Sequence, residues 1–225
     1  MISRRISLAY GAIFVVVSMF LTFGLWQLEM LYLLPPFAGG FMLLAPTLCF
    51  GLYESSRRLA LGEQPSFRDI VGALGRARGQ LSLMTGMLIL LFYLWLHMAL
   101  LIFLLFHGMA APDPGNFIDE VFFHPRSVAF LVIGTGAGLV IAGIVFAISA
   151  VSIPMLLDRD CGVVGAVQTS VNAVAANWKP MALWGFLIVS AVTVGIATLY
   201  VGLAVTVPLI AHATWHAYRG LVDWR

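Results

Sequence analysis

Charged side chains are scarce in this sequence. Only 12 Lys and Arg residues and 10 Asp and Glu residues occur among 225, which is 10% of the chain, whereas about a quarter of the residues in a soluble domain are charged. A chain so poor in charge is unsuited to water, and the composition therefore indicates a membrane protein. The net charge of +2 is too small, and the basic residues are too dispersed, to indicate a nucleic-acid partner.

Cysteine and the short motifs of enzymes are equally scarce. The two cysteines, Cys49 in an apolar run and Cys161 in a polar connection, do not form a disulfide framework, and no Cys/His spacing resembles a zinc site. The sequence has no nucleophile elbow, glycine-rich phosphate loop or H-E-x-x-H motif. No apolar run carries the central charged pair of a pump or ion-coupled carrier. We therefore expect no catalytic residues, no metal site and no cofactor.

Long apolar runs are what the sequence has in abundance. Hydrophobic residues make up 61% of the chain, and the mean hydropathy is +1.00. Because a membrane-spanning helix needs about 20 apolar residues, the runs predict six spans, at residues 6–26, 36–53, 81–106, 128–153, 181–198 and 202–219. The first run is too long for the apolar part of a signal peptide and no A-x-A site follows it, so we expect it to be retained.

The last two predicted spans belong to one uninterrupted apolar run, Met181–Ala217. As a single straight helix this run would be ~55 Å long, nearly twice the ~30 Å hydrocarbon core of a bilayer. We therefore expect a tight turn near Thr198–Gly202.

Two shorter stretches are amphipathic. Ser66 and Asp69 have the spacing of a capping box at a helix start, and an apolar stripe accompanies them: Phe67, Ile70, Val71 and Leu74. The second stretch carries Val164, Val167, Val171 and Val174 on one side. We expect two short cytoplasmic helices that lie at the lipid headgroups, with the arginines of the first near anionic lipid.

Basic residues are divided unevenly between the two sides of the predicted bundle. One side carries Arg4, Arg5, Arg57, Arg58, Arg68, Arg76, Arg78, Arg159, Lys179, Arg219 and Arg225. The other side carries Arg126, which belongs to a polar loop at residues 108–126. Because cytoplasmic loops are enriched in Lys and Arg, we expect six spans with both termini in the cytoplasm.

Three of the spans share a proline near their cytoplasmic end. Pro46, Pro154 and Pro208 lie late in the second, fourth and sixth spans or at the span end. A proline in a membrane helix leaves a carbonyl one turn back without its donor and bends the segment. The pattern predicts an all-α bundle of three pseudo-repeated hairpins that flares on its cytoplasmic side.

Polar residues follow these prolines within two or three turns. We expect them to meet in one cytoplasmic cluster: Glu54, Arg57, Arg58, Asp158, Arg159, His212, His216 and Arg219. The charged members could hold a lipid phosphate or a partner, or they could anchor helix ends. His212 and His216 share a helix face and could supply two nitrogens to a metal or haem, although a site needs further ligands. Alternatively, both histidines lie at the interface and bond to carbonyls or water.

Four segments resemble an uncharacterised family of predicted bacterial integral membrane proteins: SLAYGAIF (Ser7–Phe14), GLYESSRRLALGEQPSFRD (Gly51–Asp69), SIPMLLDRD (Ser152–Asp160) and HATWHAYRGLV (His212–Val222). The resemblance implies a multi-pass inner-membrane protein with no established activity. Some members are labelled as cytochrome c oxidase subunits, but a haem–copper core needs histidines on several helices, and this chain has five in all. A fainter likeness is to the membrane domain found beside some glycerophosphodiester phosphodiesterases.

Together these features predict a non-catalytic accessory, assembly or scaffold component that meets the lipid bilayer, a membrane-protein partner or a second copy of itself. A transporter or lipid-handling protein is one alternative; it predicts a polar-lined pocket that reaches the bilayer midplane, and a fully packed bundle would count against it. A haem- or metal-linked subunit of a respiratory oxidase, acting through His212 and His216, is the other.

Overall fold

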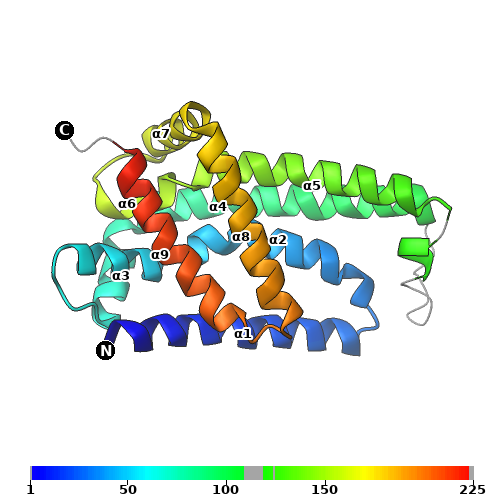
Figure 1. The fold of residues 1–225 in the computed structure, drawn as a ribbon, viewed down its shortest axis with the longest axis horizontal. Helices are drawn as coiled ribbons and strands as arrows, with labels where there is room; N and C mark the ends of the chain where they lie inside the picture. Colours follow the sequence, from blue (N-terminus) through cyan, green and yellow to red (C-terminus); the bar gives the residue numbers. More distant parts are fainter. Residues whose placement is uncertain (1, 109–118, 124, 223–225) are drawn as a thin grey trace.

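Helices form all the regular structure in the computed structural model, which describes residues 2–108, 119–123 and 125–222 (Figure 1). In order they are α1 (Ile2–Gln27), η1 (Leu31–Leu33), α2 (Leu34–Leu48), α3 (Phe50–Ala60), α4 (Phe67–His107), η2 (Asp119–Phe123), α5 (Ser127–Ser149), α6 (Ser152–Asp158), α7 (Val163–Ala176), α8 (Trp178–Ala197) and α9 (Leu203–Leu221). The all-α prediction is confirmed. Most of the polar loop predicted at 108–126 lies outside the described residues.

Five segments of this described chain are long and apolar enough to cross a membrane: Arg5–Gln27, Leu31–Ala60, Arg78–His107, Ser127–Asp158 and Trp178–Ala197. They correspond to the first five predicted spans. The helix α9 occupies the sixth but is not among them, because its second half carries His212, His216 and Arg219. The count of six spans therefore stays a prediction.

The second and fourth spans are each interrupted near their proline. α2 ends at Leu48, two residues after its internal Pro46, and α3 begins at Phe50. α5 ends at Ser149, and Pro154 lies in the first turn of α6. Pro154 has no N–H to donate to the carbonyl of Ala150, and the helix of the fourth span is broken at Ala150, between α5 and α6. α9, in contrast, continues through Pro208.

The first predicted amphipathic helix is not a separate element. Its capping box is present, because the Ser66 hydroxyl accepts from the Asp69 N–H at 3.4 Å and the Ser66 N–H donates to the Asp69 carboxylate at 2.9 Å. The helix that starts there, however, runs for 41 residues to His107 as α4. The expectation of a short helix was wrong because no proline or turn sequence separates the two stretches. At ~1.5 Å per residue α4 is ~60 Å long, so it extends well beyond one bilayer core.

The second amphipathic stretch forms the separate helix α7. Extended backbone at Arg159 and Gly162 precedes it. Ala166 and Ser170 are its buried residues, whereas Val164 is 71% exposed. Of the predicted valine stripe, Val164 and Val171 are exposed, as expected of a helix that rests on a lipid surface, whereas Val167 packs against the core.

A tight turn joins α8 to α9, at the predicted place. α8 ends at Ala197 and α9 begins at Leu203. Leu199 and Tyr200 between them adopt positive φ values of 54° and 68°, and the Thr198 hydroxyl accepts from the Gly202 N–H at 2.9 Å. This pair of helices crosses the longer ones obliquely, as Figure 1 shows.

The core lies at one end of the bundle, where α3, α6 and α9 carry Glu54, Asp158 and Arg219; we call this the charged end (left in Figure 1). The short helices after the two breaks are buried along most of their length, at Gly51–Ser56 in α3 and Ser152–Leu156 in α6. The predicted flare at this end was wrong, because the interrupted helices turn inward and fill the space.

Candidate functional site

The α3 part of the predicted polar cluster is a buried ion-pair group. The Glu54 side chain is fully buried and accepts from Arg57 Nε at 2.7 Å and Arg57 Nη2 at 2.8 Å. Arg58 Nε donates to the same carboxylate at 3.1 Å. Arg58 also pairs with Glu63 at 2.6 Å and with Asp69 at 3.2 Å. The group therefore ties the end of α3 to the start of α4.

The α6 and α9 parts of the cluster meet at Asp158. Its Oδ2 accepts from the Tyr218 hydroxyl at 3.0 Å and lies 3.6 Å from Arg219 Nη1. Arg159 lies near the Tyr218 hydroxyl, and Asp158 lies close enough to Arg57 for its negative charge to stabilise the charged guanidinium. The structure thus brings the six predicted charged residues to one end, in contact with one another or with Tyr218. Each of these charged groups has a partner within the chain, as the helix-anchoring role requires.

The two predicted histidines are in different environments. His212 lies between two hydroxyl groups, with Nε2 at 2.9 Å from Ser7 Oγ of α1 and Nδ1 at 2.6 Å from Ser56 Oγ of α3. His216 is exposed. Among the described residues no group of three His, Cys, Asp or Glu side chains could hold a metal ion. His212 therefore connects three helices, and the pair does not converge on a common ligand position.

The serines that hold His212 were not predicted from the sequence. Ser7 lies in the first predicted span and Ser56 lies in the polar stretch after the second. Serine is a common residue in both settings, so neither position stands out. The available signal was positional: Ser7 begins the first predicted span, Ser56 follows the second, and His212 lies in the second half of the sixth, so all three were expected towards the same side of the bundle. Cys161, nearby in the α6–α7 connection, is not an activated nucleophile, because burial raises the pKa of its thiol.

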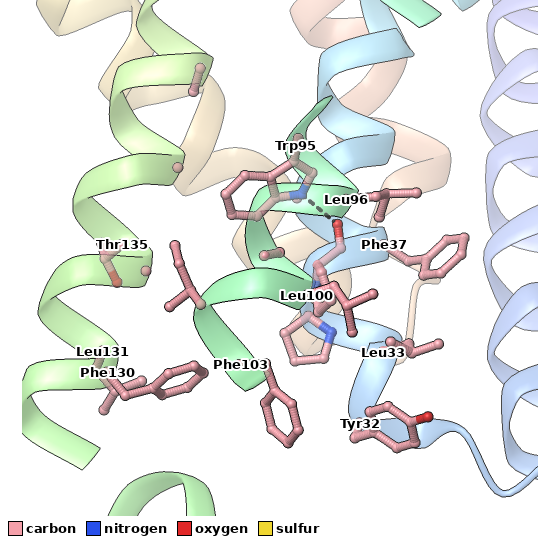
Figure 2. A pocket seen from close by; sticks show the side chains of 18 of the residues that line it. Tyr32, Leu33, Phe37, Trp95, Leu96, Leu100, Phe103, Phe130, Leu131 and Thr135 are labelled. Carbon is pink, nitrogen blue, oxygen red and sulfur yellow. Dashed lines mark hydrogen bonds between the residues drawn. The ribbon is translucent and has the colours of Figure 1, made fainter. Parts of the chain in front are cut away.

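A lateral cavity of about 590 Å³ lies between α2, α4 and α5, in the half of the bundle away from the charged end (Figure 2). Its walls include Phe37 of α2, Leu100 and Phe103 of α4, and Phe130 and Leu131 of α5. None of the described residues that line it is charged, and its few polar groups include the Tyr32 hydroxyl, His97 and the Thr135 hydroxyl. The volume falls within the range of small-molecule and cofactor sites.

Trp95 occupies the inner part of this cavity. Its indole N–H donates to the carbonyl of Pro36 at 2.7 Å, which is the dashed line in Figure 2. A Cβ built on Gly40 of α2 would lie 3.1 Å from Trp95 Cδ1, and one built on Gly138 of α5 would lie 3.1 Å from Trp95 Cη2. The ring therefore reaches from α2 to α5, and the two glycines leave room for it.

The sequence did not indicate this cavity. Its wall residues come from three helices and are ordinary components of membrane spans, so no local pattern distinguishes them. The nearest signal was the set of glycines in the second and fourth spans, which is equally typical of membrane helices in general.

Comparison with known proteins matches residues 33–158 to the model of a family described as predicted integral membrane protein (DUF2189). The match covers more than half of the 225 residues and extends from the end of η1 to the end of α6. It includes nearly all of the cavity wall and the Glu54 group, and it ends before His212. No curated protein and no solved structure matches the chain.

Proposed function

Because this chain belongs to the DUF2189 family of predicted integral membrane proteins, we propose that it is a multi-pass membrane protein without catalytic activity, and that it holds the hydrocarbon chain of a membrane lipid in the lateral cavity. The observation that carries the proposal is the cavity itself: about 590 Å³, apolar, and lined mainly by three helices.

The depth of the cavity corresponds to one leaflet of a bilayer. Its walls extend from Tyr32 to Leu43 along η1 and α2, and from Phe130 to Ala142 along α5. At ~1.5 Å per helical residue these segments are ~15–18 Å long, about half of the ~30 Å hydrocarbon core. One end of the cavity lies at the helix ends near η1 and η2, where lipid headgroups are expected, and the other end reaches the bilayer midplane. A lipid chain that enters along the membrane normal fits this shape.

The chemistry of the walls selects an apolar occupant. A polar solute transferred into such a site would lose its hydrogen bonds to water and find few in return, at a cost of ~2–7 kcal/mol for each unpaired group. A hydrocarbon chain meets Phe37, Leu100 and Phe103 on the walls and leaves no polar group unpaired. The polar lining expected for a transporter or lipid-handling protein was therefore wrong, and lipid handling is the form of that alternative that an apolar cavity supports.

The membrane placement is part of the proposal. α9 forms the sixth span, since its 19 residues give ~28 Å of helix. The charged end then faces the cytoplasm, with both termini on that side, in the inner membrane of a bacterium. The uneven division of Lys and Arg supports this orientation. The outward valines of α7 rest on the cytoplasmic headgroups, including those of anionic lipids.

Native mass spectrometry of the protein released from mild detergent tests the proposal. The wild-type protein is expected to retain lipid. Gly134 lines the cavity and Gly136 does not, and a Cβ at either position would meet no atom within 4 Å. Gly134→Phe is therefore expected to reduce the bound lipid several-fold, whereas the matched control Gly136→Phe is expected to retain it. Equal lipid content in all three proteins, or none in the wild type, would refute the proposed site.

An accessory or assembly role is the second candidate, and the exposed valine face of α7 favours it. Val164 is 71% exposed and Val171 is 38% exposed, so this helix offers apolar surface to a membrane-protein partner as well as to lipid. Recovery of a stoichiometric partner from mild detergent, lost on Val164→Glu while the lipid stays bound, would support this role. A protein that is always recovered alone would refute it.

A further inference from the structure

We propose that Trp95 forms the floor of the lateral cavity and sets the length of hydrocarbon chain that the cavity accepts. This inference rests on the proposed lipid-binding function and names one residue that decides which lipids bind. It concerns selection by chain length, because the described lining offers no charged group for recognition of a headgroup.

The position of Trp95 along α4 is the first observation. Trp95 is the innermost lining residue on this helix, and Phe103, two turns away, lies towards the mouth. On the two other walls the lining ends about one turn beyond Trp95, at Leu43 of α2 and Ala142 of α5. In Figure 2 the indole accordingly lies across the inner end of the space, with Leu100 and Phe103 along the path to Tyr32.

The way in which the ring is held is the second observation. The hydrogen bond from its N–H to the Pro36 carbonyl, at 2.7 Å, fixes the pyrrole edge against α2. Cη2 and Cζ3, at the far edge of the ring, would lie 3.1 and 3.2 Å from a Cβ on Gly138. Both ends of the ring thus meet a helix backbone, because Gly40 and Gly138 have no side chain there. The indole is a fixed barrier across the α2–α5 gap rather than a mobile side chain on the wall.

A barrier of this kind limits the depth to which a chain can enter. A tryptophan side chain covers ~150–250 Å² of apolar surface, and one methylene group corresponds to ~30 Å². The area of the ring therefore equals that of roughly five to eight methylene groups, which is an upper limit on the room that its removal creates. The expected effect of Trp95→Ala is a shift of the preferred acyl chain by about two to five carbons towards longer chains, measured against the wild type.

The experiment is a competition among phosphatidylglycerols that carry identical saturated chains of graded length. An equimolar mixture is added to delipidated protein in mild detergent, and the bound species are weighed by native mass spectrometry. Trp26 is 58% exposed and does not line the cavity, so Trp26→Ala is the control for loss of a tryptophan. Trp95→Ala is expected to shift the bound distribution to longer chains, and Trp26→Ala is expected to leave it unchanged.

A second substitution at the same position keeps the test independent of the stability of Trp95→Ala. Trp95→Phe leaves a smaller aromatic ring there and is expected to shift the preference to longer chains by fewer carbons than Trp95→Ala. Trp26→Phe, outside the cavity, is its control. If the wild type binds lipid but folded Trp95→Ala, or Trp95→Phe where the former does not fold, keeps the wild-type distribution, the role of Trp95 is refuted. If the wild type binds no lipid, the proposed function itself fails.

Discussion

Replacement of Gly11 by alanine tests the closest backbone contact between α1 and α9. A Cβ on Gly11 would lie 2.2 Å from the carbonyl oxygen of Ala204 and 2.7 Å from its carbonyl carbon. Real Cβ atoms almost never approach another atom to less than 3.0 Å. Both atoms that would clash belong to helix backbone, so no side-chain rotation can relieve the contact and the two helices must separate by roughly 1 Å.

The contact has a second consequence in lipid. The carbonyl of Ala204 is the one that Pro208 leaves without an intrahelical donor, because proline has no N–H for the residue four positions earlier. An uncovered backbone carbonyl in a bilayer is unfavourable. Gly11 places its backbone directly against this oxygen, a position in which a Cα hydrogen can form a weak C–H···O bond. If α1 and α9 separate in Gly11→Ala, the carbonyl of Ala204 loses this C–H···O contact and the two helices lose packing contacts.

The magnitude follows from a comparison of two glycines on the same helix. Gly→Ala within a helix is favourable by ~1 kcal/mol from backbone propensity. At Gly24 a Cβ would meet no atom within 4 Å, so Gly24→Ala is expected to raise the free energy of unfolding by up to that amount. At Gly11 an overpacking cost of ~1–3 kcal/mol opposes the same gain. The difference in unfolding free energy between the two variants is therefore expected to be about 1–3 kcal/mol, with Gly11→Ala the less stable.

This difference can be measured by unfolding the proteins with sodium dodecyl sulfate in mixed micelles. Circular dichroism and tryptophan fluorescence report the unfolding. Wild type, Gly11→Ala and Gly24→Ala are compared at the same detergent ratio. If Gly11→Ala proves as stable as Gly24→Ala, then α1 and α9 do not approach as closely as described and the reasoning is refuted.

Three further outcomes are expected. Glu54→Gln removes the buried carboxylate that Arg57 and Arg58, both partly exposed, share, and loss of both ion pairs should lower the unfolding free energy by ~2–4 kcal/mol. Arg57→Gln removes one of the two pairs and should lower it by ~1–2 kcal/mol; the reverse order would contradict the pairing of both arginines with one carboxylate. His212→Ala should lower the unfolding free energy by ~1–3 kcal/mol because two hydrogen bonds are lost, whereas His216→Ala should leave it almost unchanged. Thermal melting of both variants in one detergent measures this, and equal losses would contradict the different environments of the two histidines. Glu29 lies opposite the cytoplasmic termini in the proposed orientation, so Glu29→Cys in intact cells should react with a membrane-impermeant maleimide. Labelling only after lysis would contradict this orientation.

Much of the fold was predictable because membrane insertion depends on local composition. A run of about 20 apolar residues is the requirement for a span, and it can be recognised without knowledge of the other helices. The turn at Thr198–Gly202 was predictable for the same reason, since one helix over Met181–Ala217 would be too long for a bilayer. The Ser66 capping box is likewise a relation between residues three positions apart.

The packing at the two ends of the bundle was not predictable in this way. Pro46 and Pro154 indicated bends, but not that the segments after them would turn inward and be buried on most sides. Whether a bent helix splays outward or packs inward depends on which other helices occupy the space, and α9 occupies it through Trp215 and Tyr218. The flare expected at the charged end was therefore wrong.

The candidate site was likewise predictable only in part. The charged residues were predicted as one cluster because they follow spans on a common side of the membrane, and the depth of a residue is a property of the sequence. The serines around His212 and the glycines on both sides of Trp95 depend instead on the rotation of each helix about its axis. That rotation is set by contacts between helices, which composition does not encode.

By itself, therefore, the sequence determined that the chain lies in a membrane, which stretches are apolar enough to cross it, and which residues gather at the charged end of the bundle. Each of these follows from the free energy of transferring a short segment from water to lipid. Only the tertiary structure decided that the charged end is the packed one, that Glu54 is buried beside its arginines, and that α2, α4 and α5 leave an apolar cavity lined by Trp95. Inside a bilayer every span is equally apolar, so the arrangement depends on shape and close packing between helices rather than on hydrophobicity.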